Sequence, residues 1–374
     1  MNATARRVLF VGAFPPPERQ VFGGMATSCR LLLQSSFARR VELDLLDSTQ
    51  VSTPPPSLPV RAWLASRRIV RFVAQFERRR PDAVLLFAAV GGSILEKGAM
   101  AWYARLRGVP ALMFPRSGFA IDDSERSWLA RRWMKWAFGG ARKLLCQSPR
   151  WQHFATHTLG FAPGDAPIVA NWTASPELLA LGKSRRPRAA APLRLLFVGW
   201  LDREKGVVEL LEACRQLAAS RSFVLTCVGE GNHSQAGREF VARHGLESGV
   251  RFRGWLQGDE LLAELAAADI FALPSWTEGL PNAMIEAMAA GLAVVTTRVG
   301  SIPDVVTHER EALLVPPRDR AALQAALLRL LDDAPLRARL GAAGQAMVEA
   351  RFGVERAADE LVAILDGLQA GTQS

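Results

Sequence analysis

The feature that most constrains the fold of this chain is the alternation of short apolar runs with longer amphipathic stretches throughout its length. Short runs that are continuously apolar are typical of strands buried on both faces of a parallel sheet, and the amphipathic stretches between them are typical of the covering helices. The pattern therefore predicts an α/β fold with two doubly wound, Rossmann-like domains, each with its ligand site at the carboxyl ends of the strands.

The predicted elements divide evenly between the two halves of the chain. Strands of the first half are predicted at residues 7–11, 41–46, 83–87, 111–114, 143–146 and 168–169. Strands of the second half are predicted at residues 194–198, 223–228, 250–252, 270–273, 293–296 and 312–315. Helices of the second half are predicted at residues 207–218, 259–268, 282–290 and 320–332. Two such domains on a short linker are expected to face each other across a cleft.

Length and charge place the boundary between the two predicted domains. At roughly 150 residues per domain, 374 residues suggest two domains. Residues 1–182 hold 24 Lys and Arg against 12 Asp and Glu, whereas residues 193–374 hold 18 against 24. We therefore predict an N-terminal domain over 1–182, a basic Pro- and Ala-rich linker over 183–192, a C-terminal domain over 193–352 and a final helix over 353–374.

The sequence lacks the features of several other classes of protein. Its longest near-continuous apolar stretch, residues 83–90, is far shorter than the roughly 20 residues of a membrane-spanning helix. Four cysteines without a CxxC pair predict no disulfide framework, so we expect a reduced, cytoplasmic protein. The absence of GxGxxG argues against an NAD enzyme, and we find no signature of a nucleic-acid-binding module. We therefore expect no nucleic-acid partner.

One pair of histidines has the spacing of metal ligands. His153 and His157 are four residues apart and would share a face of a helix. No third ligand lies near them in the sequence. We therefore expect no metal site.

Lys205 is the single lysine in the second half of the chain. It lies in a loop between a predicted strand that ends at Gly199 and a predicted helix that begins near Gly206. A cation at a helix N-terminus adds to the amides and the dipole that already favour an anion there. Lys205 therefore suits a phosphate group, and Arg203 could add a planar guanidinium. The alternative is a solvated lysine in a surface loop.

A second loop carries two carboxylates with seven residues between them. The run LPSWTEGLPNAMIEAMAAG (273–291) leads from a predicted strand through Glu278 to a helix whose first turn is marked by Pro281. Glu286 then lies one turn inside the helix among apolar neighbours, where a carboxylate needs hydroxyl or cationic partners. In one arrangement Glu278 accepts from sugar hydroxyls, Glu286 accepts from ribose hydroxyls, and the amides of 279–283 face a diphosphate. The alternative makes Glu278 a helix cap and Glu286 an internal ion-pair partner.

Two basic stretches of the first half contain tryptophans at intervals. They span residues 61–80 and residues 126–143. Basic amphipathic helices with Trp at the rim are typical of anchors that lie in the plane of a membrane. The alternative is a pair of helices that pack Trp on the core and expose arginine. Because the first half is also strongly basic, we expect reversible contact with an anionic membrane surface.

Several motifs of the second half occur in the order and spacing of a known family. They are VGWLDREKG (198–206), VGEG (228–231), VRFRG (250–254), ADIFALPS (268–275) and EGLPNAMIEAMAAGLAVVTT (278–297). Together they resemble the retaining glycosyltransferases of family 4, glycosyl transferases group 1, which have the GT-B fold. The first half resembles the family more thinly, through the loop Gly23-Gly24, the segment FPRSG (114–118) and Cys146-Gln-Ser148.

The resemblance implies that the C-terminal domain binds a nucleotide-diphosphate sugar and that the N-terminal domain holds the acceptor. It implies a role in catalysis for Glu278, at the sugar hydroxyls, and for Lys205, at the donor phosphates. The implied donor-binding residues are Gly199, Arg203, Lys205, Gly229, Glu278, Gly279, Leu280, Pro281, Asn282 and Glu286. The implied residues on the acceptor or diphosphate side are Gly23, Gly24, Arg116 and Ser117. The last helix, 353–374, is implied to return to the first domain.

The family is known to need no metal bound by a DxD motif, and this chain has no DxD. We therefore expect neither a metal nor a cofactor besides the donor substrate. Two positions depart from the family pattern: Trp200 stands where an Arg usually follows the strand-ending glycine, and Arg116 lies in a segment where many members carry a His. We expect Arg203 to supply the charge that is missing at Trp200, and Arg116 to help orient acceptor or phosphate.

These expectations combine into one predicted function and two alternatives. We predict a metal-independent, retaining hexosyltransferase of surface-polysaccharide biosynthesis that acts on a glycan or polyprenyl-linked acceptor. We expect it in the cytoplasm, peripheral to the inner face of the plasma membrane. Two alternatives stay open. One is a non-catalytic GT-B-shaped binding or scaffold subunit, motivated by Trp200. The other is a nucleotide-sugar epimerase or phosphorylase of the same architecture.

Overall fold

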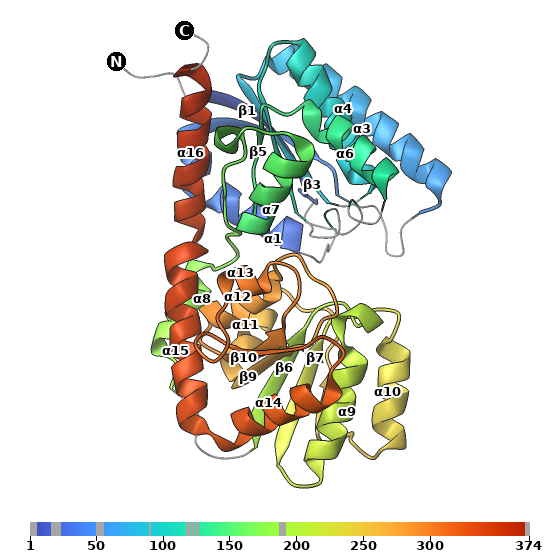
Figure 1. Ribbon diagram of the computed structural model, residues 1–374, viewed down its shortest axis with the longest axis vertical. Coiled ribbons are helices and arrows are strands. Elements are labelled where there is room, and N and C mark those ends of the chain that lie inside the picture. The colour runs from blue at the N-terminus through green and yellow to red at the C-terminus, as the bar shows by residue number, and fades with distance from the viewer. Residues whose placement is uncertain are drawn as a thin grey trace. The chain divides into compact units, whose positions relative to one another are not determined.

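A computed structural model gives the structure of the chain and describes residues 6–15, 24–49, 56–89, 91–116, 121, 124, 127–186 and 192–370. The chain forms two compact units (Figure 1). Unit 1 comprises Met1–Trp172 together with Val354–Ser374, and unit 2 comprises Thr173–Gly353. Each unit is described by itself below.

Unit 1 is built on a parallel sheet with the strand order β2-β1-β3-β4-β5. Its strands are β1 (Arg6–Gly12), β2 (Val41–Asp47), β3 (Ala83–Ala88), β4 (Ala111–Pro115) and β5 (Lys143–Leu144). Its helices are α1 (Gly24–Gln34), α2 (Phe37–Arg40), α3 (Leu58–Arg79), α4 (Gly92–Leu106), α6 (Trp128–Gly139), α7 (Pro149–His153) and α16 (Val354–Ala370), with a π-helical turn at Phe154–Leu159. This is the doubly wound arrangement that the apolar runs predict.

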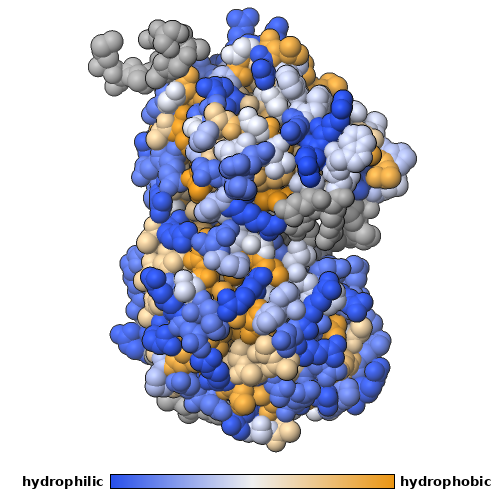
Figure 2. Space-filling model, in the orientation of Figure 1, coloured by the Kyte–Doolittle hydropathy of each residue, from blue (hydrophilic) through white to orange (hydrophobic). Residues whose placement is uncertain are grey.

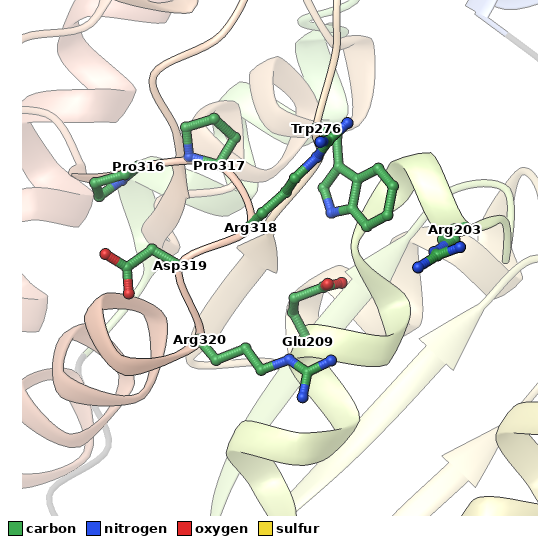
Figure 3. A pocket seen from close by; sticks show the side chains of 8 residues that line it. All are labelled: Arg203, Glu209, Trp276, Pro316, Pro317, Arg318, Asp319 and Arg320. Carbon is green, nitrogen blue, oxygen red and sulfur yellow. The ribbon is translucent and has the colours of Figure 1, made fainter.

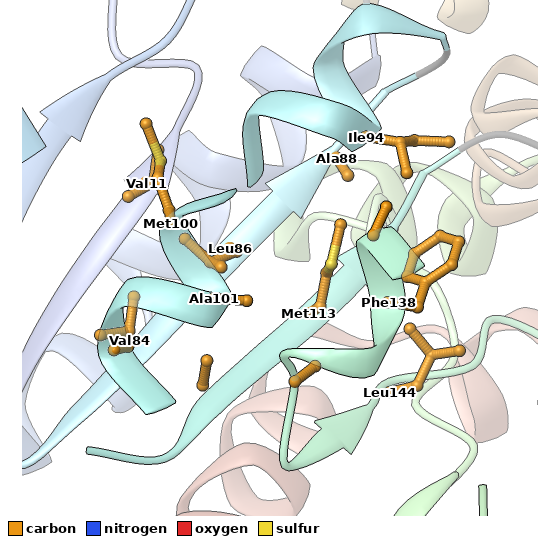
Figure 4. Close-up of a cluster of buried hydrophobic side chains, with 14 of the residues drawn as sticks. Val11, Val84, Leu86, Ala88, Ile94, Met100, Ala101, Met113, Phe138 and Leu144 are labelled. Carbon is orange, nitrogen blue, oxygen red and sulfur yellow. The ribbon is translucent and has the colours of Figure 1, made fainter. Parts of the chain in front are cut away.

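Both faces of this sheet are buried, which explains its continuously apolar strands. Leu9 and Val11 of β1 pack in one cluster with residues of α3, α4 and α6 (Figure 4). Their neighbours Val8 and Phe10 point to the opposite face and pack with residues of α1 and α16. Alternate side chains of one strand thus serve two hydrophobic cores.

Unit 2 is built on a six-stranded parallel sheet with the order β11-β10-β9-β6-β7-β8. Its strands are β6 (Leu193–Val198), β7 (Phe223–Val228), β8 (Val250–Phe252), β9 (Ile270–Leu273), β10 (Ala293–Thr297) and β11 (Leu313–Val315). Its helices are α8 (Pro176–Ser184), α9 (Val207–Ala218), α10 (Ser234–Arg243), α11 (Asp259–Ala267), α12 (Asn282–Ala289), α13 (Ile302–Val305), α14 (Arg320–Asp332) and α15 (Ala334–Arg351). Helix α9 packs against α10 and α14, whereas α12 packs against α8 and α15.

The strand order reverses between β6 and β9, because β6 leads to β7 on one side and β9 leads to β10 on the other. A reversal of this kind opens a crevice at the carboxyl ends of the two strands, where open α/β sheets bind ligands. The loops that follow β6 and β9 are therefore the first place to look for a site in unit 2.

Two details of the fold differ from the sequence prediction. The predicted strand at 168–169 is only an isolated bridge between Ile168 and Cys146, and the predicted strand at 143–146 is shortened to β5. The predicted N-terminal domain also extends too far, since residues 173–182 belong to unit 2. There α8 packs against α12 and α15, and Arg185 donates to three backbone carbonyls of unit 2.

No helix in the described part of the chain is long and apolar enough to cross a membrane.

Candidate functional site

Lys205 and Glu278 meet at the carboxyl edge of the sheet in unit 2. The Lys205 Nζ lies 2.7 Å from Glu278 Oε1, although the two residues are 73 positions apart in the chain. Lys205 follows β6 and Glu278 follows β9, so the pair lies where the strand order reverses. The Lys205 side chain is 24% exposed and that of Glu278 is 8% exposed. A buried carboxylate and a partly exposed ammonium therefore share the crevice.

A hydroxyl that the sequence analysis did not single out completes the setting of Glu278. Ser275 Oγ donates to Glu278 Oε1 at 2.8 Å, and Ser275 is fully buried. The Ser275 carbonyl in turn accepts from Thr297 Oγ1, at the end of β10, at 2.5 Å. This arrangement makes Glu278 an ion-pair and hydrogen-bond partner and not the helix cap of the alternative interpretation. The signal in the sequence was a serine three residues before a buried glutamate.

Glycine is needed where the loop after β6 passes the loop after β9. Gly206 has φ +72°, and a Cβ at this position would lie 2.0 Å from the Pro274 carbonyl oxygen. The same two loops are joined by a hydrogen bond from the Trp276 amide to the Glu204 carbonyl at 2.7 Å. Only a residue without a side chain allows this approach, which places Lys205 beside Glu278.

A second close approach fixes the loop that carries Glu278. Gly300 has φ +57°, and a Cβ there would lie 2.0 Å from the Glu278 carbonyl oxygen. The Ser301 amide donates to the Gly279 carbonyl at 2.8 Å. The strand-to-helix corner after β10 thus packs against the Glu278–Gly279 backbone and holds it in place.

Gly199 and Gly229 directly follow the neighbouring strands β6 and β7 and lie against each other. The Gly199 amide donates to the Val228 carbonyl oxygen at 3.0 Å. A Cβ on Gly229 would lie 1.9 Å from the Gly199 carbonyl oxygen, and Gly229 has φ +127°. The structure thus places both predicted glycines at the same edge of the sheet as Lys205.

Helix α12 begins directly after the Glu278 loop. Leu280 and Pro281 are buried, Pro281 precedes the helix in an extended conformation, and Asn282 is its first residue. Glu286 lies one turn further along α12 and is half-buried. The N-terminus of α12, with the positive end of its dipole, therefore lies beside the Lys205–Glu278 pair.

Two residues near the pair take positions that the sequence did not predict. The Arg203 guanidinium lies over the ring of Trp276, with Cζ 5.2 Å from the ring centroid. Trp200 packs edge-on against Trp255, with ring centroids 4.7 Å apart. That Arg203 supplies the phosphate charge missing at Trp200 stays a prediction.

In unit 1, Arg116 lies at the end of β4 inside an aromatic cage. Its Cζ lies 4.8 Å, 5.1 Å and 5.6 Å from the ring centroids of Phe114, Trp172 and Phe87. Its Nη2 donates to Ser28 Oγ of α1 at 2.6 Å, whereas its buried Nη1 has no partner among the described residues. Burial lowers the pKa of Arg116 to about 10. The cage thus holds an incompletely paired guanidinium.

The other predicted residues of unit 1 are described only in part. Gly24 is the first residue of α1. Gly23 and Ser117 lie outside the described residues. Their predicted roles on the acceptor or diphosphate side stay predictions.

The histidine and cysteine residues of the chain form no site in the described structure. The rings of His153 and His157 stack with centroids 4.0 Å apart, and among the described residues no three His, Cys, Asp or Glu side chains converge as metal ligands would. All four cysteines are buried and free. Burial raises the pKa of the Cys146 and Cys227 thiols to about 12.

Comparison with known proteins adds evidence that is independent of this geometry. Residues 192–333 match the family model of glycosyl transferases group 1. The amylovoran biosynthesis glycosyltransferase AmsK of Erwinia amylovora is 34% identical over 232 residues, which cover 60% of this chain and 56% of that protein. The chain thus spans about half the length of this curated relative.

Solved structures share the fold over almost the whole chain. The sucrose-phosphate synthase of Thermosynechococcus elongatus has a TM-score of 0.78 at 21% identity and covers 98% of this chain and 100% of its own. HepE of Anabaena, solved in complex with UDP and glucose, has a TM-score of 0.71 at 18% identity and covers 97% of this chain and 100% of its own. The expected architecture, two Rossmann-like α/β domains of the GT-B type, is confirmed.

Proposed function

We propose that this protein is a glycosyltransferase of polysaccharide biosynthesis that uses a nucleotide-diphosphate sugar, because residues 192–333 match the family model of glycosyl transferases group 1. We further propose that it retains the anomeric configuration and needs no metal. The observation that carries the proposal is the contact between the Lys205 ammonium and the buried Glu278 carboxylate at 2.7 Å. AmsK, named for amylovoran biosynthesis, supports the polysaccharide assignment.

The Lys205–Glu278 pair has bonding capacity left for a donor substrate. Both hydrogen bonds that Glu278 accepts from the described residues go to Oε1, which leaves Oε2 for a sugar hydroxyl. An ammonium carries three N–H donors, so Lys205 can hold Glu278 and a phosphate oxygen together. A hydroxyl bond to a carboxylate contributes roughly 1.5–3 kcal/mol. Glu278 would then bind the sugar, and Lys205 would bind the diphosphate.

In the proposed reaction the bond between the anomeric carbon and the diphosphate oxygen breaks. The acceptor oxygen forms its bond to that carbon on the same face, and the hydroxyl proton passes to the departing phosphate oxygen. Negative charge develops on the departing phosphate oxygens. Lys205 and the N-terminus of α12 would stabilise this charge, since both are fixed before the reaction begins. Glu286, on the same helix, would accept from the ribose hydroxyls. HepE of Anabaena, which was solved with UDP and glucose, supports this class of donor.

We propose that Arg116 of unit 1 binds on the acceptor side of the reaction. A buried guanidinium with a donor that lacks a partner is costly until an anion reaches it. We assign Arg116 to an anionic group of the substrates, such as the phosphate of a polyprenyl-linked acceptor. Gly23, Gly24 and Ser117 are proposed to lie on the same side.

A product-release assay tests the proposed activity. Purified protein is incubated with a panel of nucleotide sugars, and the released nucleoside diphosphate is measured with and without a lipid-linked glycan acceptor. We expect turnover with at least one donor, and a loss of roughly 10²–10³-fold in Lys205→Ala and Glu278→Gln, the size seen when one transition-state contact is removed. Glu286→Gln is expected to raise KM for the donor. Unchanged turnover in all three folded variants would reject the site.

We also propose that unit 1 contacts an anionic membrane through α3 and α6. Both helices pack against α4, and they expose Trp63 and Val70 on α3 and Trp128 and Trp136 on α6, each by 50% or more. Helix α6 has no acidic residue, and Glu77 is the single acidic residue of α3. Figure 2 shows apolar residues among polar ones over this part of unit 1. Exposed apolar side chains among cationic ones favour binding to a membrane surface with anionic headgroups.

Vesicle flotation tests the membrane proposal. The protein is expected to float with vesicles that contain phosphatidylglycerol and to sink with neutral vesicles, and the association should weaken as salt rises. The double variant Trp63→Ser and Trp128→Ser is expected to float less, whereas Trp255→Phe in unit 2 serves as the control. Flotation that is independent of lipid charge, or unaffected by the double variant, would contradict it.

A further inference from the structure

A hollow in unit 2 lies beside the donor site but is lined by other side chains. Arg203, Glu209, Trp276, Arg318 and Arg320 line it, and we call it the Trp276 hollow (Figure 3). It forms where the turn before α9, the loop after β9 and the loop between β11 and α14 come together. Neither Lys205 nor Glu278 lines it.

A buried carboxylate without a partner forms part of the wall. Glu209, in the first turn of α9, is only 6% exposed. Its buried Oε2 has no hydrogen-bond partner among the described residues. Figure 3 shows this carboxylate pointing into the space that Trp276, Arg203 and Arg320 surround. A buried carboxylate in this state is costly, and a hydroxyl donor from a ligand would relieve the cost.

The hollow also contains a buried donor without a partner. The indole Nε1 of Trp276 is buried and has no acceptor among the described residues. Two guanidinium groups contact the ring of Trp276, with Cζ of Arg203 at 5.2 Å and Cζ of Arg318 at 4.3 Å from its centroid. The site therefore needs a ligand that both donates and accepts hydrogen bonds.

Arg318 is held in a backbone conformation that an arginine seldom adopts. Its φ is +63°, and Arg80 and Glu309 are the other described non-glycine residues with a positive φ. A conformation of this kind costs on the order of 1 kcal/mol for a residue with a side chain. Here it directs the guanidinium over Trp276 at the rim of the hollow.

The rim of the hollow has a local excess of positive charge. Arg203, Arg318 and Arg320 are exposed, and in the described part of the chain none of the three has an ion-pair partner. Asp319 caps α14 through Oδ1, which accepts from the Ala322 amide at 2.9 Å. The hollow is thus lined by three arginines against two carboxylates, those of Glu209 and Asp319. Three guanidinium groups around one hollow favour a phosphate there, because a phosphate accepts several charge-assisted hydrogen bonds.

We propose that the Trp276 hollow is a second ligand site of this protein, and that it binds a sugar phosphate. Hydroxyls of the sugar donate to Glu209, and phosphate oxygens accept from the guanidinium groups and from Trp276 Nε1. The inference goes beyond the proposed function, because it needs neither Lys205 nor Glu278. The two sites nevertheless share their loops, since Arg203 and Lys205 lie on one turn. Because neither Lys205 nor Glu278 lines the hollow, we expect a ligand there to bind together with a donor and not in place of it.

Calorimetric titration of the full chain with glucose 6-phosphate tests the proposal. We expect heat of binding at millimolar ligand, weaker binding to inorganic phosphate, none to glucose, and a loss of affinity as salt rises. Saturation with UDP should leave the binding of glucose 6-phosphate in place.

Two variants separate the proposed contacts from general charge effects. Arg318→Gly removes the guanidinium and relieves the positive φ, and Glu209→Gln removes the charge while keeping the shape. Both variants should keep or raise the melting temperature of the protein. Both should lower the affinity for glucose 6-phosphate at least about tenfold, which corresponds to roughly 1.4 kcal/mol. Arg243→Ala, an exposed arginine on α10, and Lys205→Ala should bind as the parent does.

Three results would overturn the proposal. The first is the absence of heat with glucose 6-phosphate at millimolar concentration. The second is equal affinity for inorganic phosphate and glucose 6-phosphate, since Glu209 would then contact no hydroxyl. The third is displacement of glucose 6-phosphate by UDP, which would place the ligand in the donor site.

Discussion

At the scale of single residues, the candidate site depends on one buried carboxylate and on the two side chains that bond to it. Glu278 has a cation, Lys205, and a hydroxyl, Ser275, on the same oxygen. The sequence made Lys205 and Glu278 conspicuous, because one is the single lysine of its half and the other lies in a Gly- and Pro-flanked loop. The sequence analysis did not single out Ser275, because a serine three residues before a glutamate does not by itself show that its hydroxyl reaches the carboxylate, as Ser275 Oγ does at 2.8 Å.

Gly206→Ala tests whether the close approach of the two loops positions Lys205. An alanine there has the strain of a positive φ, roughly 1 kcal/mol, and its Cβ would meet the Pro274 carbonyl oxygen at 2.0 Å. The overlap adds roughly 1–3 kcal/mol. We expect a lower melting temperature and a large loss of donor turnover.

Gly245→Ala is the matched control for this substitution. Gly245 also has a positive φ, +65°, but a Cβ there meets nothing within 4 Å. The Gly245→Ala variant should lose only the roughly 1 kcal/mol that a positive φ costs, and its donor turnover should stay that of the parent. Equal effects of the two substitutions would show that backbone strain alone matters at Gly206.

At the scale of elements, the strands of unit 2 were predicted almost to the residue, because each is a short apolar run bounded by turn residues. The predicted helices at 207–218 and 320–332 coincide with α9 and α14. The strand predicted at 168–169 was wrong, because only Ile168 of these two apolar residues forms a bridge, with Cys146. A run so short has no periodicity from which strand pairing can be predicted.

The edge strand β11 supplies a prediction about pH. His308 Nδ1 accepts from the Leu314 amide of β11 at 2.9 Å. Burial, followed by the nearby charge of Arg298, lowers the pKa of His308 below its usual value of about 6.5. The unfolded chain therefore binds this proton more readily, so His308 contributes stability above pH 6.5 that is lost as the pH falls through its folded pKa.

Melting temperatures between pH 7 and pH 5 check this prediction. His308→Asn keeps an acceptor for Leu314 but does not titrate, so its melting temperature should fall less over this range than that of the parent. Exposed His244→Asn is the control and should follow the parent. Parallel pH profiles for the parent and His308→Asn would contradict the role of His308.

At the scale of the whole molecule, unit 1 is assembled from two segments that the sequence separates, whereas unit 2 is one continuous segment. Unit 1 takes its last helix, α16, from the end of the chain. The composition placed the domain boundary in the basic linker at 183–192, but packing places it at Thr173, because α8 covers part of unit 2. A shift in charge locates a solvated linker only approximately, since it does not show which core a neighbouring helix covers.

Leu361→Ala tests the contribution of α16 to unit 1. Leu361 is 1% exposed and packs in the cluster that contains Val8 and Phe10 of β1. We expect a loss of roughly 2–5 kcal/mol in the free energy of unfolding, as for other buried leucines, measured by urea denaturation. Ala363→Ser, an exposed position on the same helix, should change it little. A loss as small as that of the control would mean that α16 is not part of the core.

The central claim is that a nucleoside diphosphate binds between Lys205 and the start of α12. Calorimetric titration of the full chain with UDP, and with GDP and ADP if UDP gives no heat, tests it most directly. We expect saturable binding by the parent and by Lys183→Ala, a surface lysine of unit 2 paired with Glu349, and binding at least about tenfold weaker in Lys205→Ala. A folded protein that binds none of the three nucleotides, or binds them equally well without Lys205, would contradict the claim and favour a scaffold without catalysis.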